Sequence, residues 1–363
     1  MSSQKEAVIF IPGFYARSKG YFLENFLAVG LTTRLENKPV EMERDEVKIA
    51  GQSGRRFTYE SEAGEQKFLD VYEIFWSDLI DKLSDRSVKD QVVRGIFLFI
   101  YWFFSGIWFV ARKSRLLLVQ IVIILFLTVL WYYGNVVIAL VAIGQNPSAF
   151  GLQVLPAEWG STLAAYGKTL GGWPIWAVAS IILSFLPTSP ASLVDVMDFI
   201  ARYLQDETVS TVGGIRDRIR QRVAIALGDV LKEAEYERVT VLAHSAGVLV
   251  GIDLLADYRS KISKPIRFVS MGGQIEFLSY KSTWISEEAA RCLDNRLLVT
   301  WEDYYSEQDW LSTKTPTPKS GNAPKFNSSR IQLRMPLAKQ ITGETHDAYF
   351  FERSLLERLL EWN

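Results

Sequence analysis

Two long apolar runs in the middle of the chain constrain its fold more than any other feature. Residues 95–111 carry no charged side chain, and residues 116–143 carry none over a further 28 positions. The second run is long enough to cross a bilayer as one helix, because a span needs roughly 20 residues. A third run, 173–186, is shorter and fits a returning or re-entrant segment at about 170–187. The sequence therefore predicts a membrane-embedded helical insertion at 93–187.

The alternative for these runs is a buried helical hairpin inside a soluble core. Unbroken apolar runs of this length are seldom surrounded by protein on all sides in a chain of this size. Aromatic residues at the run ends also resemble the interfacial belts of membrane proteins; they are Trp102, Trp131, Tyr132, Tyr133, Trp173 and Trp176. Both features favour the membrane interpretation.

The distribution of charge predicts an orientation. A basic cluster, RKSR at 112–115, separates the first two runs, whereas the linker 144–172 holds only Glu158 and Lys168 as charges. If 116–143 crosses and about 170–187 returns, with 95–111 in the interface, the basic cluster lies on the side of both soluble halves. That arrangement satisfies the positive-inside tendency and predicts a cytoplasmic soluble domain. If 95–111 also spanned, the two soluble halves would lie on opposite sides, which would split one domain.

The soluble halves alternate short apolar runs with helical patterns. Strands are expected at 6–11, 68–76, 237–242, 265–270, 296–301 and 330–335, and helices near 78–92, 191–205, 209–235 and 347–361. This alternation predicts a mostly parallel sheet flanked by helices. Residues 1–92 and 188–363 are therefore expected to form one α/β domain that the apolar insertion interrupts.

Composition excludes several classes of function. A formal net charge of −1 leaves no large basic face, so no nucleic-acid partner is expected. The single cysteine, Cys292, excludes an internal disulfide. Two histidines and one cysteine, far apart in sequence, do not form a plausible zinc set, and no glycine loop of the phosphate-binding kind appears. The sequence thus predicts neither a metal nor a cofactor.

The segment VTVLAHSAGVLVG, residues 239–251, carries the strongest chemical signal. A short buried strand runs into a turn at Ser245 and then into an apolar helix. A turn that exposes a serine hydroxyl in this way is strained and needs small residues two positions away on each side, here Ala243 and Gly247. The alternative is a serine that only caps the helix.

This segment resembles the nucleophile elbow of the α/β-hydrolase superfamily, in particular lipases and esterases with alanine in place of the first glycine. The resemblance covers roughly residues 5–92 and 190–363, and minimal soluble members have no counterpart of the apolar block. The family order of serine, acid and then histidine implies His346 as the general base. The other histidine, His244, lies inside the elbow, where its side chain points away from the hydroxyl. A surface histidine in a polar loop is the alternative for His346.

The resemblance also implies an acid after the strand 296–301. Asp309 is the first choice and Asp303, nearer the strand end, is the runner-up, with Glu302 and Glu307 behind them. The acid would hold the histidine in one tautomer and stabilise its charged form.

Two backbone N–H groups would complete such a site. Family members take one oxyanion donor from the turn after an early strand, which implies Phe14 in IFIPGFY; Ala246 would supply the other. The alternative for the first turn is a plain strand end, which Pro12-Gly13 explains without catalysis.

The leading hypothesis is therefore a membrane-anchored serine hydrolase of the carboxylesterase or lipase kind. Its expected partners are the lipid bilayer and an ester substrate, with lipid esters favoured by the location. Acyl transfer or thioester cleavage by the same three residues is one alternative. A non-catalytic membrane scaffold with a hydrolase-like fold is the other.

Overall fold

The computed structural model describes residues 5–14, 18–35, 38–61, 64–104, 108, 115–145, 156–171, 190–207 and 213–361. The third apolar run, 173–186, and most of the basic cluster lie outside these residues. The chain divides into two compact units. The sheet unit comprises Met1–Leu79, Asp206–Gln340 and Glu344–Asn363, and the helical unit comprises Ile80–Gln205 with Ile341–Gly343. The helical unit is thus wider in sequence than the apolar block alone.

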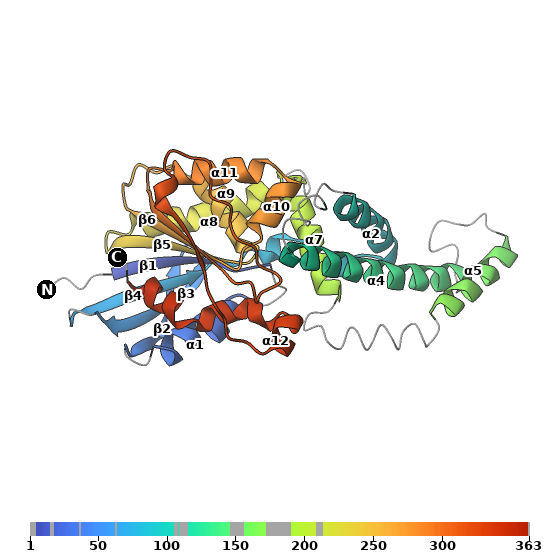
Figure 1. The fold of residues 1–363 in the computed structure, drawn as a ribbon, viewed down its shortest axis with the longest axis horizontal. Helices are drawn as coiled ribbons and strands as arrows, with labels where there is room; N and C mark the ends of the chain where they lie inside the picture. Colours follow the sequence, from blue (N-terminus) through green and yellow to red (C-terminus); the bar gives the residue numbers. More distant parts are fainter. Residues whose placement is uncertain are drawn as a thin grey trace. The chain divides into compact units, whose positions relative to one another are not determined.

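Within the described residues, eight strands form one mixed sheet in the order β2-β3-β4-β1-β5-β6-β7-β8 (Figure 1). The strands are β1 (Lys5–Ile11), β2 (Val40–Ile49), β3 (Gln52–Glu60), β4 (Gln66–Glu73), β5 (Tyr236–His244), β6 (Ile266–Met271), β7 (Leu298–Tyr305) and β8 (Phe326–Arg330). Every pairing from β4 to β8 is parallel, whereas β2–β3 and β3–β4 are antiparallel. The predicted mostly parallel α/β sheet is confirmed at this level.

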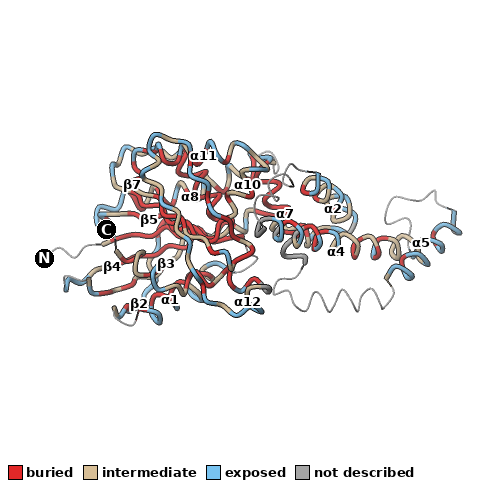
Figure 2. The backbone as a smooth tube through the Cα atoms, in the orientation of Figure 1, coloured by how far each residue is buried: buried red, intermediate tan, exposed pale blue. Residues whose placement is uncertain are grey.

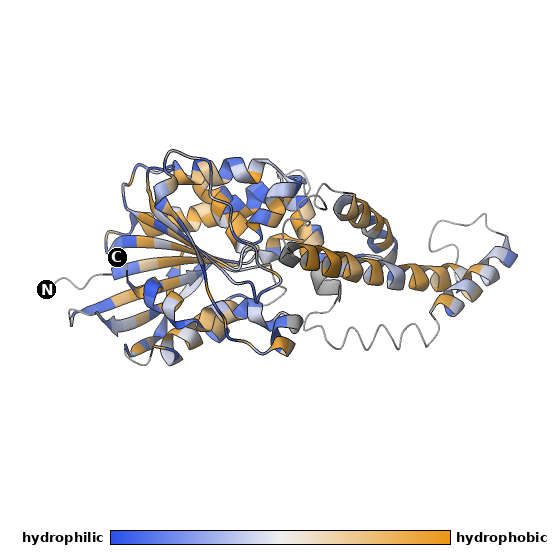
Figure 3. Cartoon of the chain, viewed as in Figure 1, coloured by the Kyte–Doolittle hydropathy of each residue, from blue (hydrophilic) through white to orange (hydrophobic). Residues whose placement is uncertain are grey.

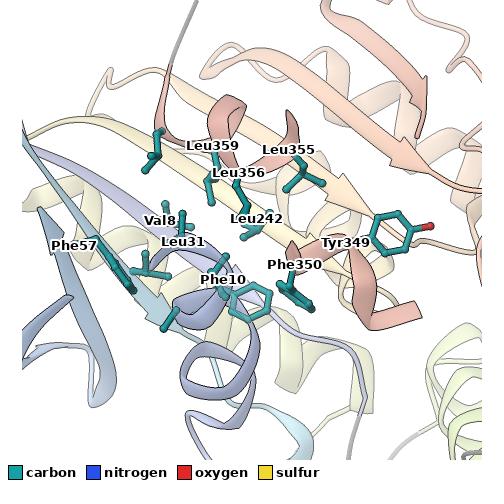
Figure 4. Close-up of a cluster of buried hydrophobic side chains, with 14 of the residues drawn as sticks. Val8, Phe10, Leu31, Phe57, Leu242, Tyr349, Phe350, Leu355, Leu356 and Leu359 are labelled. Atoms are coloured by element: carbon teal, nitrogen blue, oxygen red, sulfur yellow. The ribbon is translucent and has the colours of Figure 1, made fainter. Parts of the chain in front are cut away.

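Helices and helical turns cover both faces of the sheet (Figure 1). In the sheet unit they are η1 (Leu23–Leu27), α1 (Ala28–Thr33), η2 (Ser77–Leu79), α8 (Ile215–Lys232), α9 (Gly247–Asp257), α10 (Ile275–Lys281), α11 (Trp284–Leu293), η6 (Ala323–Lys325), η7 (Glu344–Phe351) and α13 (Arg353–Leu360); α12 (Leu337–Thr342) belongs partly to each unit. Successive side chains of a strand point to opposite faces. Val8 and Phe10 of β1 accordingly join the buried cluster with α1, η7 and α13 (Figure 4), while the other face of β1 is covered by α8 and α9.

The central strands are buried almost completely (Figure 2). Residues 7–11 of β1 are fully enclosed, as expected for a parallel strand with helices on both faces. The register pairs Ile11 with Ala243 and His244 with Met271, so the carboxyl ends of β1, β5 and β6 lie side by side. Loops that follow these strands therefore meet at one edge of the sheet.

Three predicted elements differ from the structure. The prediction of one helix near 78–92 is wrong. The short helical turns η2 and η3 (Leu83–Asp85) occupy the first part of this range, and α2 begins only at Val88. The Ser87 hydroxyl accepts a hydrogen bond from the Asp90 amide and so caps α2 at that point. β8 lies a few residues before the expected 330–335. The predicted C-terminal helix is divided into η7, which is a 3₁₀ segment, and α13.

The helical unit holds, among its described residues, α2 (Val88–Phe103), α4 (Arg115–Gln145), α5 (Ala157–Leu170), α7 (Pro190–Leu204) and the turn η3. A β-carbon on Gly95 of α2 would lie 2.8 Å from the Trp131 ring of α4, so these helices pack closely. Likewise, a β-carbon on Gly144 would lie 2.3 Å from that of Ala164. The second contact comes from α5, a helix that forms inside the segment read from sequence as a linker.

Helix α7 joins α2 and α4 through polar contacts. Asp198 of α7 is buried and pairs with Arg94 of α2, with Arg202 3.8 Å away. The Thr128 hydroxyl of α4 contacts the Met197 sulfur at 3.2 Å. In α4, residues Ile121–Gln145 form one helix that is long and apolar enough to cross a membrane by length and composition (Figure 3).

Candidate active site

Ser245 occupies a strained turn between β5 and α9. Its φ of +57° lies in the left-handed region, which residues other than glycine seldom adopt. Two hydrogen bonds hold the turn: the Ser245 amide donates to Met271 O and the Val248 amide donates to Ser245 O, both at 3.0 Å. Strain of this kind persists only where the surroundings enforce it, and it is common at functional positions.

Two glycines make room for this turn. A β-carbon on Gly247 would come within 2.2 Å of Ile11 O and 2.7 Å of Pro12 O, so the first turn of α9 can approach the end of β1 only with glycine there. A β-carbon on Gly13 would lie 2.9 Å from Ser245 Cβ and 3.2 Å from its Oγ. Gly13 thus lies against the serine side chain, a role that the sequence indicated only as a strand-ending Pro-Gly turn.

His346 and Asp309 form a buried pair. The His346 Nδ1 lies 2.8 Å from Asp309 Oδ2, and the side chains are 2% and 0% exposed. Burial alone would lower the pKa of His346, but the Asp309 carboxylate outweighs it and raises the pKa above the usual value. The contact leaves Nε2 as the nitrogen that can exchange a proton with a substrate or a hydroxyl.

The loop after β7 fixes the Asp309 carboxylate. Its second oxygen, Oδ1, accepts a hydrogen bond from the Leu311 amide at 3.0 Å. The Asp309 amide donates to Ser306 O at 3.2 Å, and the Ser312 amide donates to Asp309 O at 3.1 Å. We call residues 306–312 the acid loop. Its internal bonds fix the conformation of the loop around the carboxylate.

The runner-up acid, Asp303, holds different partners. Its carboxylate accepts hydrogen bonds from the Ser270 hydroxyl, the Ser328 hydroxyl, and both the amide and hydroxyl of Thr315. Burial raises its pKa, while these donors act to lower it. The other two carboxylates considered are also engaged elsewhere: Glu302 with Arg267 and Arg358, and Glu307 with Arg330. Of the four, only Asp309 is recorded with a bond to His346.

His244, the other histidine, contacts His346 through its ring and through the His346 carbonyl. Its Nε2 lies 2.8 Å from His346 O, so it donates to that carbonyl when the proton is on Nε2. Its ring packs against His346 and Phe350, with centroids 4.8 Å apart in both cases. Complete burial, together with His346, lowers its pKa well below the usual value, which keeps it neutral. The elbow histidine therefore anchors the backbone of the second histidine, which sequence reasoning did not foresee.

The segment after β6 lies beside both the serine and the histidine. Met271 O accepts from the Ser245 amide, and Gly272 follows with a φ of +65°. A β-carbon there would lie 3.3 Å from His346 Cε1 and 3.2 Å from Tyr349 Cε2. From sequence, the Gly272-Gly273 pair indicates only a strand-end turn.

The two expected oxyanion donors lie on two segments beside Ser245. Ala246 follows the serine and caps α9, and Phe14 follows Gly13, which contacts the serine directly. Phe14 is buried, and its ring lies 5.9 Å from that of Trp76, whose indole donates to Pro12 O at 3.1 Å. The turn that contains Phe14 is therefore held by Trp76, through the hydrogen bond to Pro12 O and the contact between the two rings.

Within the described ranges, no group of three or more histidine, cysteine, aspartate or glutamate side chains is arranged to hold a metal ion. Comparison of the chain with protein-family models, curated proteins and solved structures gave no match.

Proposed function

We propose that the chain is a membrane-anchored serine hydrolase of the α/β-hydrolase type that cleaves carboxylic esters. The observation that carries the proposal is the buried contact of His346 Nδ1 with Asp309 Oδ2, at the sheet edge where Ser245 adopts a positive φ. A nucleophile on a strained turn, a histidine and an orienting carboxylate in this chain order are the parts that acyl transfer to serine requires.

In the proposed reaction, Ser245 Oγ attacks the acyl carbon and its proton passes to His346 Nε2. The amides of Phe14 and Ala246 donate to the oxyanion that forms. The intermediate then collapses, the alcohol leaves with the proton from His346, and the acyl group remains on Ser245. A water molecule, deprotonated by His346, attacks the acyl-enzyme, and the carboxylic acid leaves as the serine regains its proton.

The helical unit supports the membrane part of the proposal. Exposed apolar side chains recur every three or four positions on one face of α2, at Val93, Ile96, Ile100 and Phe103, and on α4, at Val119, Val122, Phe126 and Val129. At 16 residues α2 is about 24 Å long, less than a bilayer core of roughly 30 Å. We therefore assign α2 to the interface and α4 to a span. With the return across the bilayer that the sequence predicts at about 170–187, both parts of the sheet unit lie on the cytoplasmic side. A site held at a bilayer favours lipid esters as substrates.

Fluorophosphonate labelling of the detergent-extracted chain tests the catalytic part. The wild type should be labelled, Ser245→Ala should lose all label, and His346→Ala should lose most of it. Ser320→Ala is the matched control. The Ser320 hydroxyl makes an exposed hydrogen bond to Asp294, and neither residue belongs to the candidate site. A folded wild type that takes no label, or label that persists in Ser245→Ala, would contradict the proposal.

Two further measurements test the membrane and substrate parts. Membranes washed with alkaline carbonate should retain the chain, and its release would contradict an integral span. Hydrolysis of lipid esters in vesicles should exceed that of soluble short-chain esters. Turnover of the short esters alone would preserve the serine hydrolase and remove the lipid substrate.

A further inference from the structure

The buried hydroxyl of Tyr349 joins the two segments that carry the acid and the base. Tyr349 lies on η7, three residues after His346, and is 0% exposed. Its hydroxyl oxygen lies on the side of the ring away from the apolar cluster (Figure 4). That oxygen accepts a hydrogen bond from the Ser306 amide at 3.1 Å, at the first residue of the acid loop.

The side chains of Ser312 and Asp309, both in the acid loop, also interact with this hydroxyl. Burial, followed by the Asp309 charge, raises the pKa of Tyr349 well above its usual value, so the phenol keeps its proton at every working pH. Because the Ser306 amide is already a donor to this oxygen, the phenol proton is left for the acceptors of the acid loop, the Asp309 carboxylate and the Ser312 hydroxyl. One hydroxyl thus holds the acid loop at its first residue and lies against its carboxylate.

We propose that Tyr349 is a positioning residue that keeps Asp309 against His346. The geometry provides the reason: the acid loop follows β7, whereas His346 and Tyr349 share η7, so their relative position depends on bonds between the two segments. The Asp309–His346 contact is one such bond, and the bond from the Ser306 amide to the Tyr349 hydroxyl is another. The inference rests on the proposed function only for its consequence on rate, since the placement of the pair does not depend on turnover.

The two histidines of the chain make this placement measurable. The titratable groups that face His346 are Asp309, the neighbouring Asp347, and His244 of the elbow, which stays neutral. In ¹⁵N-histidine NMR of the full chain in detergent, one signal should titrate and the other should not. His244 therefore serves as an internal reference for the pKa of His346.

The deciding experiment compares Tyr349→Phe with Tyr59→Phe. Tyr59 is a matched control, because its buried hydroxyl also donates one hydrogen bond, to Leu360 O at 2.7 Å, away from the acid loop. In Tyr349→Phe the pKa of His346 should fall by about one unit, since burial still lowers it while the raising effect of Asp309 weakens. The control should leave it unchanged. An unchanged or raised pKa in Tyr349→Phe, or an equal fall in the control, would overturn the proposal.

A second measurement covers the case in which Tyr349→Phe fails to fold. In the wild type, the Tyr349 hydroxyl proton and the His346 Nδ1 proton should give a nuclear Overhauser effect, because the Asp309 carboxylate interacts with both side chains. Its absence when both protons are visible would overturn the proposal. If esters are hydrolysed, Tyr349→Phe should lower kcat about tenfold with KM little changed. Absence of all hydrolysis would contradict the proposed function while leaving the NMR result to decide on Tyr349.

Discussion

Asp303 and Asp309 lie six residues apart on one strand and its following loop, yet their surroundings differ in kind. Asp303 is enclosed by hydroxyl and amide donors from β6, β8 and the loop at Thr315, which can neither gain nor lose a proton near neutral pH. Asp309 is just as buried, but it contacts the imidazole of His346, which can gain or lose a proton near neutral pH. Burial of a carboxylate therefore does not indicate catalysis; the protonation chemistry of its partner does.

The largest expected effect is on the Asp309 side of this comparison. Asp309→Asn should reduce kcat/KM for an ester by about 10⁴-fold, or about 5 kcal/mol in activation free energy, because an amide no longer stabilises charged His346. Its melting temperature should change little. Steady-state kinetics and thermal unfolding in detergent measure both, and an activity loss below tenfold would contradict the assignment of the acid.

Asp303→Asn should show the opposite behaviour. Its amide keeps one acceptor oxygen but turns an NH₂ group toward donors, so buried hydroxyls lose their acceptor. We expect the free energy of unfolding to fall by about 2–3 kcal/mol. Protein that remains folded should label with fluorophosphonate at the wild-type rate. A fully folded, inactive variant would instead make Asp303 part of the chemistry.

A third buried carboxylate extends the comparison to pH. Glu73 accepts hydrogen bonds from the Gly20 and Leu23 amides, and burial raises its pKa to about 7. Because the folded protein binds the Glu73 proton more tightly than the unfolded chain, protonated Glu73 contributes its full stabilisation below about pH 4.5. This contribution is lost as the pH rises through the folded pKa of about 7. The wild type should therefore lose up to about 3 kcal/mol from this group between pH 4.5 and 8.

Glu73→Gln cannot titrate, so its melting temperature should depend less on pH over that interval and exceed that of the wild type at pH 8. Melting curves at four or five pH values check this. If the two proteins show parallel pH dependence, Glu73 is ionised in the folded state at a normal pKa.

The smallest expected effect concerns His346 itself. The base must be neutral to accept the serine proton, and Asp309 raises its pKa above the usual value of about 6.5. The acid limb of kcat/KM should therefore have its midpoint above about 6.5 in the wild type. In Asp309→Asn the residual activity should show a limb at lower pH, because burial, which lowers the pKa, is then opposed only by the charge of Asp347. If the acid limb of kcat/KM has the same midpoint in both proteins, Asp309 does not control the pKa of His346.

Local sequence patterns predicted the strands and the strand–turn–helix around Ser245 better than the contacts between distant segments. The strand–turn–helix around Ser245 is encoded within about a dozen residues, and a chain with two histidines leaves few options for a base. The choice between Asp309 and Asp303 depends on which loop returns to η7, which no short pattern records. No short pattern records the contact of α5 with α4 either, although the small residues of α5 permit it. Tyr349 lies within the helix expected at 347–361, and nothing near it in sequence indicates its contact with the acid loop.

The position of β1 in the sheet has a consequence for how the chain is made. β1 pairs with β4 on one side and with β5 on the other. After β4 has been synthesised, residues Ile80–Gln205 of the helical unit must be synthesised before β5. At ordinary rates of synthesis, the residues from Glu73 to Tyr236 take roughly 10 to 30 s. During that interval the newly made β1–β4 half-sheet has an apolar edge with no strand to cover it. The nascent chain should therefore depend on a chaperone bound near β1 until β5 emerges.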